Sequence, residues 1–227
     1  MTISVVHYVT ATGKDLYQAW LDRLKDRTAK LAIVRRVIRI ELGDLGDHKL
    51  IGDGVSELRI DVGPGYRVYL AASGRRLSFS SLPGRRAPRS ATSRRRRRIG
   101  RISNNAMTKA KAKAKVPPYV SHEEATVSMF REDPELAAEY LNSVLADGDR
   151  KELLRAMRYL STAFGGVAGV AKATKLNART LYRTLSEHGN PELDTFTALL
   201  KAMGMRITVA PIKSAKPTRS RVAQKAA

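Results

Sequence analysis

Residues 57–70, ELRIDVGPGYRVYL, alternate apolar and polar side chains on both sides of a Gly-Pro-Gly sequence. This period of two is typical of strands with one buried face, and Gly63-Pro64-Gly65 is a turn signal. The stretch therefore predicts a β-hairpin. A three-residue turn would bring together three pairs on the core face: Val62 with Tyr66, Ile60 with Val68, and Leu58 with Leu70.

The same register predicts a polar outer face on the hairpin. It places Arg59 opposite Tyr69 and Asp61 opposite Arg67. Guanidinium groups hold phosphate and an aromatic ring can stack on a base, so this face suits RNA. The alternative is an ordinary solvent face with a cross-strand ion pair.

The residues before the hairpin predict a strand and two helices. The segment Ile3–Val9 is apolar and β-branched, as in a buried strand. Two sets of apolar residues then recur with helical spacing: Tyr17, Trp20, Leu21 and Leu24, followed by Leu31, Val34, Ile38 and Leu42. The predicted order is β-α-α-β-β, and the alternating pattern stops after Leu70.

The charge of this 227-residue chain, formally +21, lies in two segments. Residues 75–115 hold 11 Arg and 4 Lys with no acidic residue, and residues 213–227 hold 5 more basic residues. The remaining basic residues nearly balance the 21 acidic ones. Such like-charge blocks are usually solvated linkers and tails, and the alternative is non-specific attraction to nucleic acid.

A helix-turn-helix pattern follows in the second half of the chain. Val167–Thr174 predicts a short helix, residues 175–177 a turn, and Ala178–Leu185 a second helix that Asn177 caps. Leu181 and Leu185 point to the core, whereas Arg179 and Arg183 point outward. An apolar back and a polar front suit a recognition helix in a DNA major groove. The spacing of Phe196, Leu199, Leu200 and Met203 predicts a supporting helix, and Arg206–Ala210 a short strand.

Residues 2–77 resemble the HigB-type toxins of the RelE/ParE superfamily. The resemblance is carried by the spacing of WLDRLKD, ELGDLGDHK, VSELRI and GPGYRVY. It implies a small α/β fold with two helices packed on an antiparallel sheet, and a metal-independent endonuclease that cleaves ribosome-bound mRNA. It also implies that Lys49, Arg59, Arg67 and Tyr69 are the catalytic, RNA-contacting residues.

The chain departs from that toxin pattern after GRRL. Such toxins continue into an apolar strand, whereas this chain reads SFSSLPGRRAPRSATSRRRRRIGRIS. We interpret this composition as the product of a frameshift near Ser78, which leaves a truncated sheet with an open edge. A natural basic linker is the alternative. If neither other reading frame over codons 78–106 encodes an apolar strand, the frameshift hypothesis is wrong.

Residues 120–210 resemble the HigA-type addiction-module antidotes, which carry an Xre/Cro-like DNA-binding domain. The segment LYRTLSEHGNP is the most specific part of the resemblance. It implies an antidote that neutralises the neighbouring toxin and represses its own operon as a homodimer. The implied DNA-facing residues are Lys175, Asn177, Arg179, Thr180 and Arg183.

These patterns predict an α+β chain of four segments: a toxin module at 1–77, a basic linker at 78–119, an antidote domain at 120–210 and a basic tail at 211–227. The expected partners are operator DNA, ribosome-bound mRNA, and either a cognate toxin or the chain's own toxin half. The absence of cysteine and the dispersed histidines argue against a thiolate or histidine metal site, and we expect no cofactor. No apolar run approaches the roughly 20 residues of a membrane span, so a cytoplasmic location fits best.

Two functions remain open from the sequence. The first is a DNA-binding autorepressor and antidote fused to a damaged toxin. The second is a self-inhibited endoribonuclease whose toxin half is still active.

Overall fold

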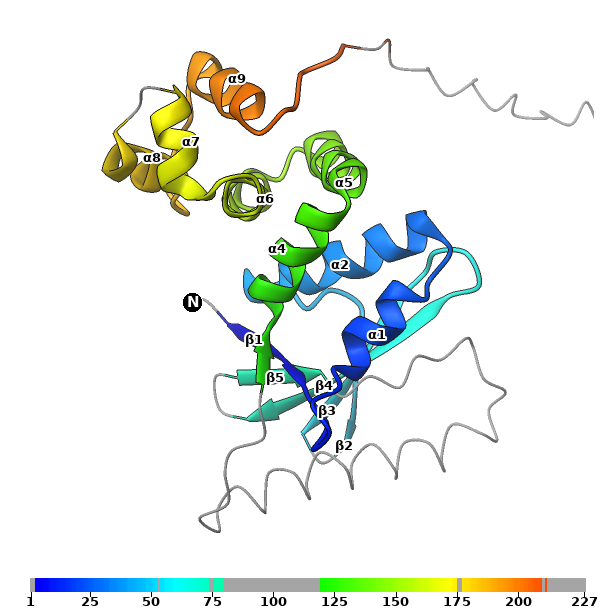
Figure 1. The fold of residues 1–227 in the computed structure, drawn as a ribbon. Coiled ribbons are helices and arrows are strands. Elements are labelled where there is room, and N and C mark those ends of the chain that lie inside the picture. Colours follow the sequence, from blue (N-terminus) through cyan, green and yellow to red (C-terminus); the bar gives the residue numbers. More distant parts are fainter. Residues whose placement is uncertain are drawn as a thin grey trace, which may run out of the picture.

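The computed structural model describes residues 3–52, 54–73, 76–79, 119–174, 177–209 and 211. It combines a mixed β-sheet with a helical C-terminal part, which is an α+β architecture (Figure 1). The described strands form a six-stranded sheet in the order β2-β3-β4-β5-β1-β6.

The N-terminal half runs through seven described elements. They are β1 (Ser4–Tyr8), α1 (Leu16–Asp22), α2 (Arg27–Glu41), β2 (His48–Gly52), β3 (Val55–Ile60), β4 (Tyr66–Ser73) and β5 (Arg76–Phe79). The C-terminal half adds β6 (Tyr119–Ser121), α4 (His122–Glu132), α5 (Pro134–Asp147), α6 (Arg150–Ala163), α7 (Gly166–Thr174), α8 (Ala178–Thr184) and α9 (Leu193–Ala202).

Helix α2 forms a middle layer between the sheet and the C-terminal helices (Figure 1). Asp26 starts it, because its side chain accepts a hydrogen bond from the N–H of Ala29. The predicted face residues Val34 and Ile38 are fully buried, but so are Ile33 and Val37. This wide apolar surface is explained by contacts of α2 with β1 and β3 on one side and with α5 on the other.

The predicted hairpin forms, but the predicted register is wrong. Ile60 pairs with Tyr66, Arg59 with Arg67 and Leu58 with Val68. The loop therefore contains five residues, 61–65, instead of three. Gly63 and Gly65 both adopt positive φ angles (55° and 78°), and the N–H of Gly65 donates to the carbonyl of Val62, which closes the turn inside this longer loop.

The sheet does not end at the predicted point. Strand β5 lies between β4 and β1, antiparallel to the first and parallel to the second. The expected truncation before this strand is therefore wrong within the described residues, since Ser78 and Phe79 pair in the sheet. Sequence alternation missed β5 because only four residues form it. Most of the proposed frameshifted segment, residues 80–106, lies outside the described residues.

The other edge of β1 is covered by the C-terminal half. Strand β6 pairs antiparallel with β1, and Val6, His7 and Tyr8 face Ser121, Val120 and Tyr119. Helix α4 continues directly from β6 and packs on β1 (Figure 1). One buried apolar cluster extends from Val5 to Met203, so the two halves share a core.

The C-terminal segment differs from its prediction as a strand. Arg206–Val209 belongs to no strand, and Ala210 lies outside the described residues. Ile207 and Val209 are exposed, at 47% and 92%. The alternating pattern was present, but the described part of the chain provides no neighbouring strand for it.

Candidate functional sites

The four residues expected to contact RNA lie on one face of the sheet. Lys49 on β2 is opposite Glu57 on β3, which is opposite Tyr69 on β4. Arg59 and Arg67 form the adjacent cross-strand pair. Val55, Tyr69 and Ala71 form a small apolar cluster separate from the main core, which places this face away from the helices.

Glu57 organises this face as a buried carboxylate. Its Oε1 accepts from Nη1 of Arg67 at 2.5 Å and lies 3.5 Å from Nε of Arg59. Its Oε2 accepts from the hydroxyl of Tyr69 at 3.3 Å. The phenol ring is only 3% exposed. The expectation that Tyr69 offers an open ring for base stacking is therefore wrong in this structure.

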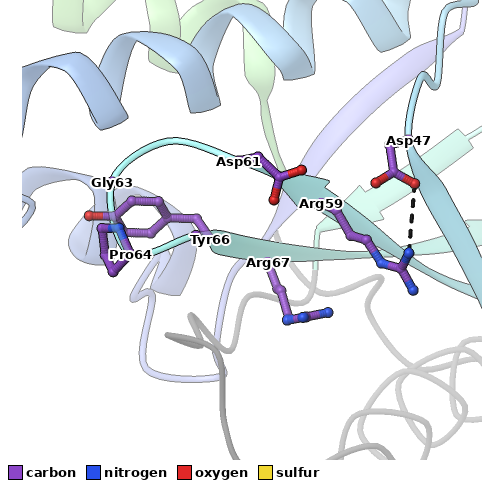
Figure 2. A pocket seen from close by; sticks show the side chains of 8 residues that line it. Asp47, Arg59, Asp61, Gly63, Pro64, Tyr66 and Arg67 are labelled. Carbon is purple, nitrogen blue, oxygen red and sulfur yellow. Dashed lines mark ion pairs between the residues drawn. The ribbon is translucent and has the colours of Figure 1, made fainter. Parts of the chain in front are cut away.

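A pocket of about 510 Å³ opens beside the hairpin loop, between Arg59, Arg67, Tyr66 and residues 63–65 (Figure 2). Asp47 and Asp61 also line it, and Asp47 Oδ1 lies 3.8 Å from Nη1 of Arg59. The described residues of this face and pocket include three basic side chains and three carboxylates: Lys49, Arg59 and Arg67, and Asp47, Glu57 and Asp61. This balance favours the cross-strand ion-pair interpretation, because a polyanion site needs an excess of positive charge.

Helices α7 and α8 form the predicted helix-turn-helix pair. The two helices contact each other, and α7 also packs on α9. The side chain of Asn177 accepts from the N–H of Arg179 at 2.8 Å and caps α8. Leu181 and Leu185 are each 1% exposed, so the predicted apolar back is confirmed.

The outer face of α8 carries two arginines. Asn177, Arg179, Thr180 and Arg183 are all exposed. Neither arginine forms an ion pair with a described residue. Lys175, which was also expected to face DNA, lies outside the described residues. Tyr182, 56% exposed and three residues after Arg179, shares their face and was missed by sequence reasoning, although its helical position would have placed it there.

A second set of side chains, also missed from the sequence, joins the two halves. Arg35 of α2 makes a two-point contact with Glu152 of α6, from Nε at 2.6 Å and Nη2 at 2.8 Å. Glu152 is fully buried, and Asp147 lies 2.6 Å from the same guanidinium. These carboxylates raise the pKa of Arg35, chiefly through the hydrogen bonds with Glu152.

The half-to-half contact also contains a buried acid. Glu41 at the end of α2 accepts from Arg155 at 3.0 Å and from the hydroxyl of Tyr159, both on α6. Burial raises the pKa of Glu41, against the lowering effect of those two partners. Burial likewise raises the pKa of Tyr159. Sequence periodicity does not predict this cluster, because Glu41 is more than a hundred residues away from Arg155 and Tyr159 in the chain.

A protein-family match covers most of the second half. Residues 122–211 match the family described as "probable addiction module antidote protein". An uncharacterized protein of Haemophilus influenzae is 50% identical over 54 residues, which are 24% of this chain and 54% of that protein. The chain thus spans about half the length of this relative. No solved structure matches the chain. The matched antidote region comprises α4 to α9 and includes the helix-turn-helix pair.

The described residues offer neither a metal-binding cluster nor a membrane-spanning helix. Within those residues no group of three or more histidine, cysteine or acidic side chains is arranged to hold a metal ion. None of the described helices is long and apolar enough to cross a membrane.

Proposed function

We propose that this chain is a type II toxin–antidote fusion. Its antidote half binds operator DNA through α7 and α8 and represses transcription in the cytoplasm, while it neutralises the toxin-like half to which it is joined. The observation that carries the proposal is a contrast between two arginine pairs. Arg179 and Arg183 are exposed and form no ion pair with a described carboxylate, whereas Arg59 and Arg67 lie beside Glu57.

Unpaired guanidinium groups on a short helix suit DNA for two reasons. They release counterions from the phosphate backbone, and they donate two hydrogen bonds to the edge of a guanine in the major groove. Asn177 and Thr180 add shorter polar groups on the same exposed surface. A homodimer would present two such helices to a palindromic operator, with half-sites about one helical turn apart.

Neutralisation is supported by the contacts that the antidote half makes with α2 and β1. The N-terminal half resembles a HigB-type toxin, with two helices over a sheet, and α4, α5 and α6 lie against its α2 and β1. Because the face that carries Lys49, Arg59 and Arg67 points away from these helices, they would neutralise the toxin-like half by occupying α2 and the edge of β1, and not by covering that face. The fused antidote therefore acts in cis, at the high effective concentration of a tethered partner.

The test is binding of the purified chain to DNA from upstream of its own coding region, followed by fluorescence anisotropy against a scrambled duplex. Arg179→Ala combined with Arg183→Ala should abolish specific binding. It should also reduce the slope of log K against log salt by about 0.9 for each lost phosphate contact. Arg158→Ala is the matched control, since Arg158 is an exposed arginine on α6. Equal affinity for the scrambled duplex would contradict the proposal.

A second candidate function is favoured by the convergence of Lys49, Arg59, Arg67 and Tyr69 on one sheet face. In this alternative the toxin-like half is an mRNA endonuclease that the antidote half keeps silent. Expression of residues 1–106 alone should then arrest growth and cleave mRNA, and Arg59→Ala with Arg67→Ala should prevent both effects. Normal growth in the presence of soluble fragment would exclude this candidate.

A further inference from the structure

The two halves meet through side chains of opposite charge. On α2, Arg27 lies 3.0 Å from Asp133 and 2.8 Å from Glu139, and Arg35 contacts Asp147 and Glu152. In these pairs the N-terminal half supplies the cations and the C-terminal half supplies the carboxylates, and in the pair of Glu41 with Arg155 the roles are reversed. Charge pairs that match across a contact are typical of two surfaces that recognise each other as separate partners.

Apolar packing and backbone pairing complete the same contact. Val144 of α5, on the helix that faces α2, is fully buried, as are Ile33 and Val37 of α2. The antiparallel pairing of β6 with β1 satisfies the backbone of an otherwise open sheet edge. The contact therefore has an apolar centre, charged pairs around it and an added strand, which are features of stable protein interfaces.

A connecting segment as long as residues 80–118 is not needed to bridge the distance between the two halves. Phe79, the last residue of β5, pairs with His7, and Tyr119, the first residue of β6, pairs with Tyr8. The segment 80–118 thus leaves and rejoins the sheet on two sides of β1, at the same end of that strand. Two strand spacings amount to about 10 Å, which a few extended residues would span.

We propose that the C-terminal half is a separable partner of the N-terminal half. The surface formed by β6, α4, α5 and α6 holds residues 3–79 without the connecting segment, and once that segment is cut it captures the N-terminal half of a second copy of this chain equally well. The name antidote for this surface rests on the proposed function, but the docking itself rests only on the contacts above.

The experiment uses the full folded chain with a site for a specific protease inserted after Gly100. After cleavage, the two pieces should co-elute in gel filtration at low micromolar concentration. Addition of a second cleaved preparation that carries a tag on its N-terminal piece should then yield complexes in which tagged N-terminal piece and untagged C-terminal piece elute together. Separation of the pieces, or precipitation of cleaved but not of intact chain, would overturn the proposal.

Two matched substitutions test the surface itself. Arg35→Ala removes the partner of buried Glu152 and should weaken retention of the pieces by about a hundredfold or more. Arg39→Ala is the control, since Arg39 lies on the same helix but pairs with Asp44 of its own half, and it should change retention less than about threefold. Equal effects of the two substitutions would overturn the assigned surface.

A milder variant covers the case in which Arg35→Ala impairs folding. Arg27→Glu acts on a half-exposed pair, and it should weaken retention several-fold. Glu139→Lys in the same chain should restore part of that loss, and lack of restoration would count against the assignment. Operator binding of intact chain is measured separately, so its failure would contradict the proposed function while leaving the docking result unchanged.

Discussion

Nε2 of His7 on β1 lies 2.9 Å from Nδ1 of His122 on α4, and both imidazole rings are buried where the two halves meet. Asp15 contacts Nδ1 of His7 at 2.7 Å, and Thr126 contacts Nε2 of His122 at 3.2 Å. With both rings neutral, one consistent set of hydrogen bonds runs from Thr126 through His122 and His7 to Asp15. A second proton on His122 would lie on Nε2, where it would reverse the bond with Thr126 and place a positive charge in a buried site.

This arrangement predicts lower stability in mild acid. Burial, followed by electrostatic interaction with His7 and with the Arg155 cation, holds the pKa of His122 well below its usual value of 6.5. The unfolded chain binds a proton near pH 6.5 and the folded chain does not, so stability is complete above that pH and falls below it. The expected slope approaches 1.4 kcal/mol per pH unit. Urea unfolding between pH 7.5 and 5 measures it.

The contribution of His122 is isolated by comparing variants. His122→Gln should flatten the profile, whereas His188→Gln, at an exposed histidine, should leave it unchanged. Glu41 contributes with the opposite sign, since its raised pKa in the fold means that its stabilising effect is lost as pH rises. That term is common to all three proteins. Identical profiles for the original chain and His122→Gln would contradict the prediction.

Local patterns predicted the helix-turn-helix well. Capping by Asn177 and burial of Leu181 and Leu185 depend on residues within two helical turns, which short-range spacing encodes. The hairpin faces were also right, because Arg59, Arg67 and Tyr69 share one face as alternation requires. The register was wrong because alternation fixes faces but not the number of residues in a loop.

The half-to-half contact was not predictable in the same way. Strands β5 and β6 have four and three residues, too few to show a period of two. His7 and His122 are 115 positions apart in the chain, and the residues around each give no indication of the other. The one local indication of this contact is the wide apolar surface of α2, which is broader than a single packed face requires and is therefore consistent with a second covering layer.

A second prediction concerns Asp133, which serves both a helix and the contact between halves. Partial burial raises its pKa, but the N–H of Leu136 and the guanidinium of Arg27 outweigh that effect and lower it. Asp133→Ala removes the cap of α5 and should cost about 1 kcal/mol. Asp133→Asn keeps a capping oxygen and loses only a half-exposed ion pair, so it should cost less than about 0.5 kcal/mol. Urea unfolding at pH 7.5 compares them, and equal losses would contradict the role as a cap.

A third prediction separates the charge of Glu57 from its hydrogen bonds. Glu57→Gln leaves Arg59 opposite Arg67 without the buried carboxylate, and should lower the free energy of unfolding by about 1–3 kcal/mol. Asp61→Asn changes the net charge by the same amount at an exposed position and should change stability by less than about 0.5 kcal/mol. Both variants should bind a short RNA oligomer more tightly than the original chain. A stability loss common to both would indicate that net charge, and not the buried bonds, is responsible.

A fourth prediction distinguishes the inner face of α8 from its outer face. Leu181 is 1% exposed, and Leu181→Ala should lower stability by about 2–5 kcal/mol through the cavity it leaves. Tyr182 is 56% exposed on the face that carries Arg179 and Arg183, so Tyr182→Ala should change stability by less than about 0.5 kcal/mol. If this face enters the major groove, Tyr182→Ala should nevertheless weaken operator binding several-fold, and more than it weakens binding to scrambled DNA. Unfolding curves and anisotropy on the same preparations provide both numbers. Unchanged operator affinity in a folded Tyr182→Ala variant would show that Tyr182 does not contact DNA. The DNA-contacting surface would then be tested by the variants of Arg179 and Arg183 alone.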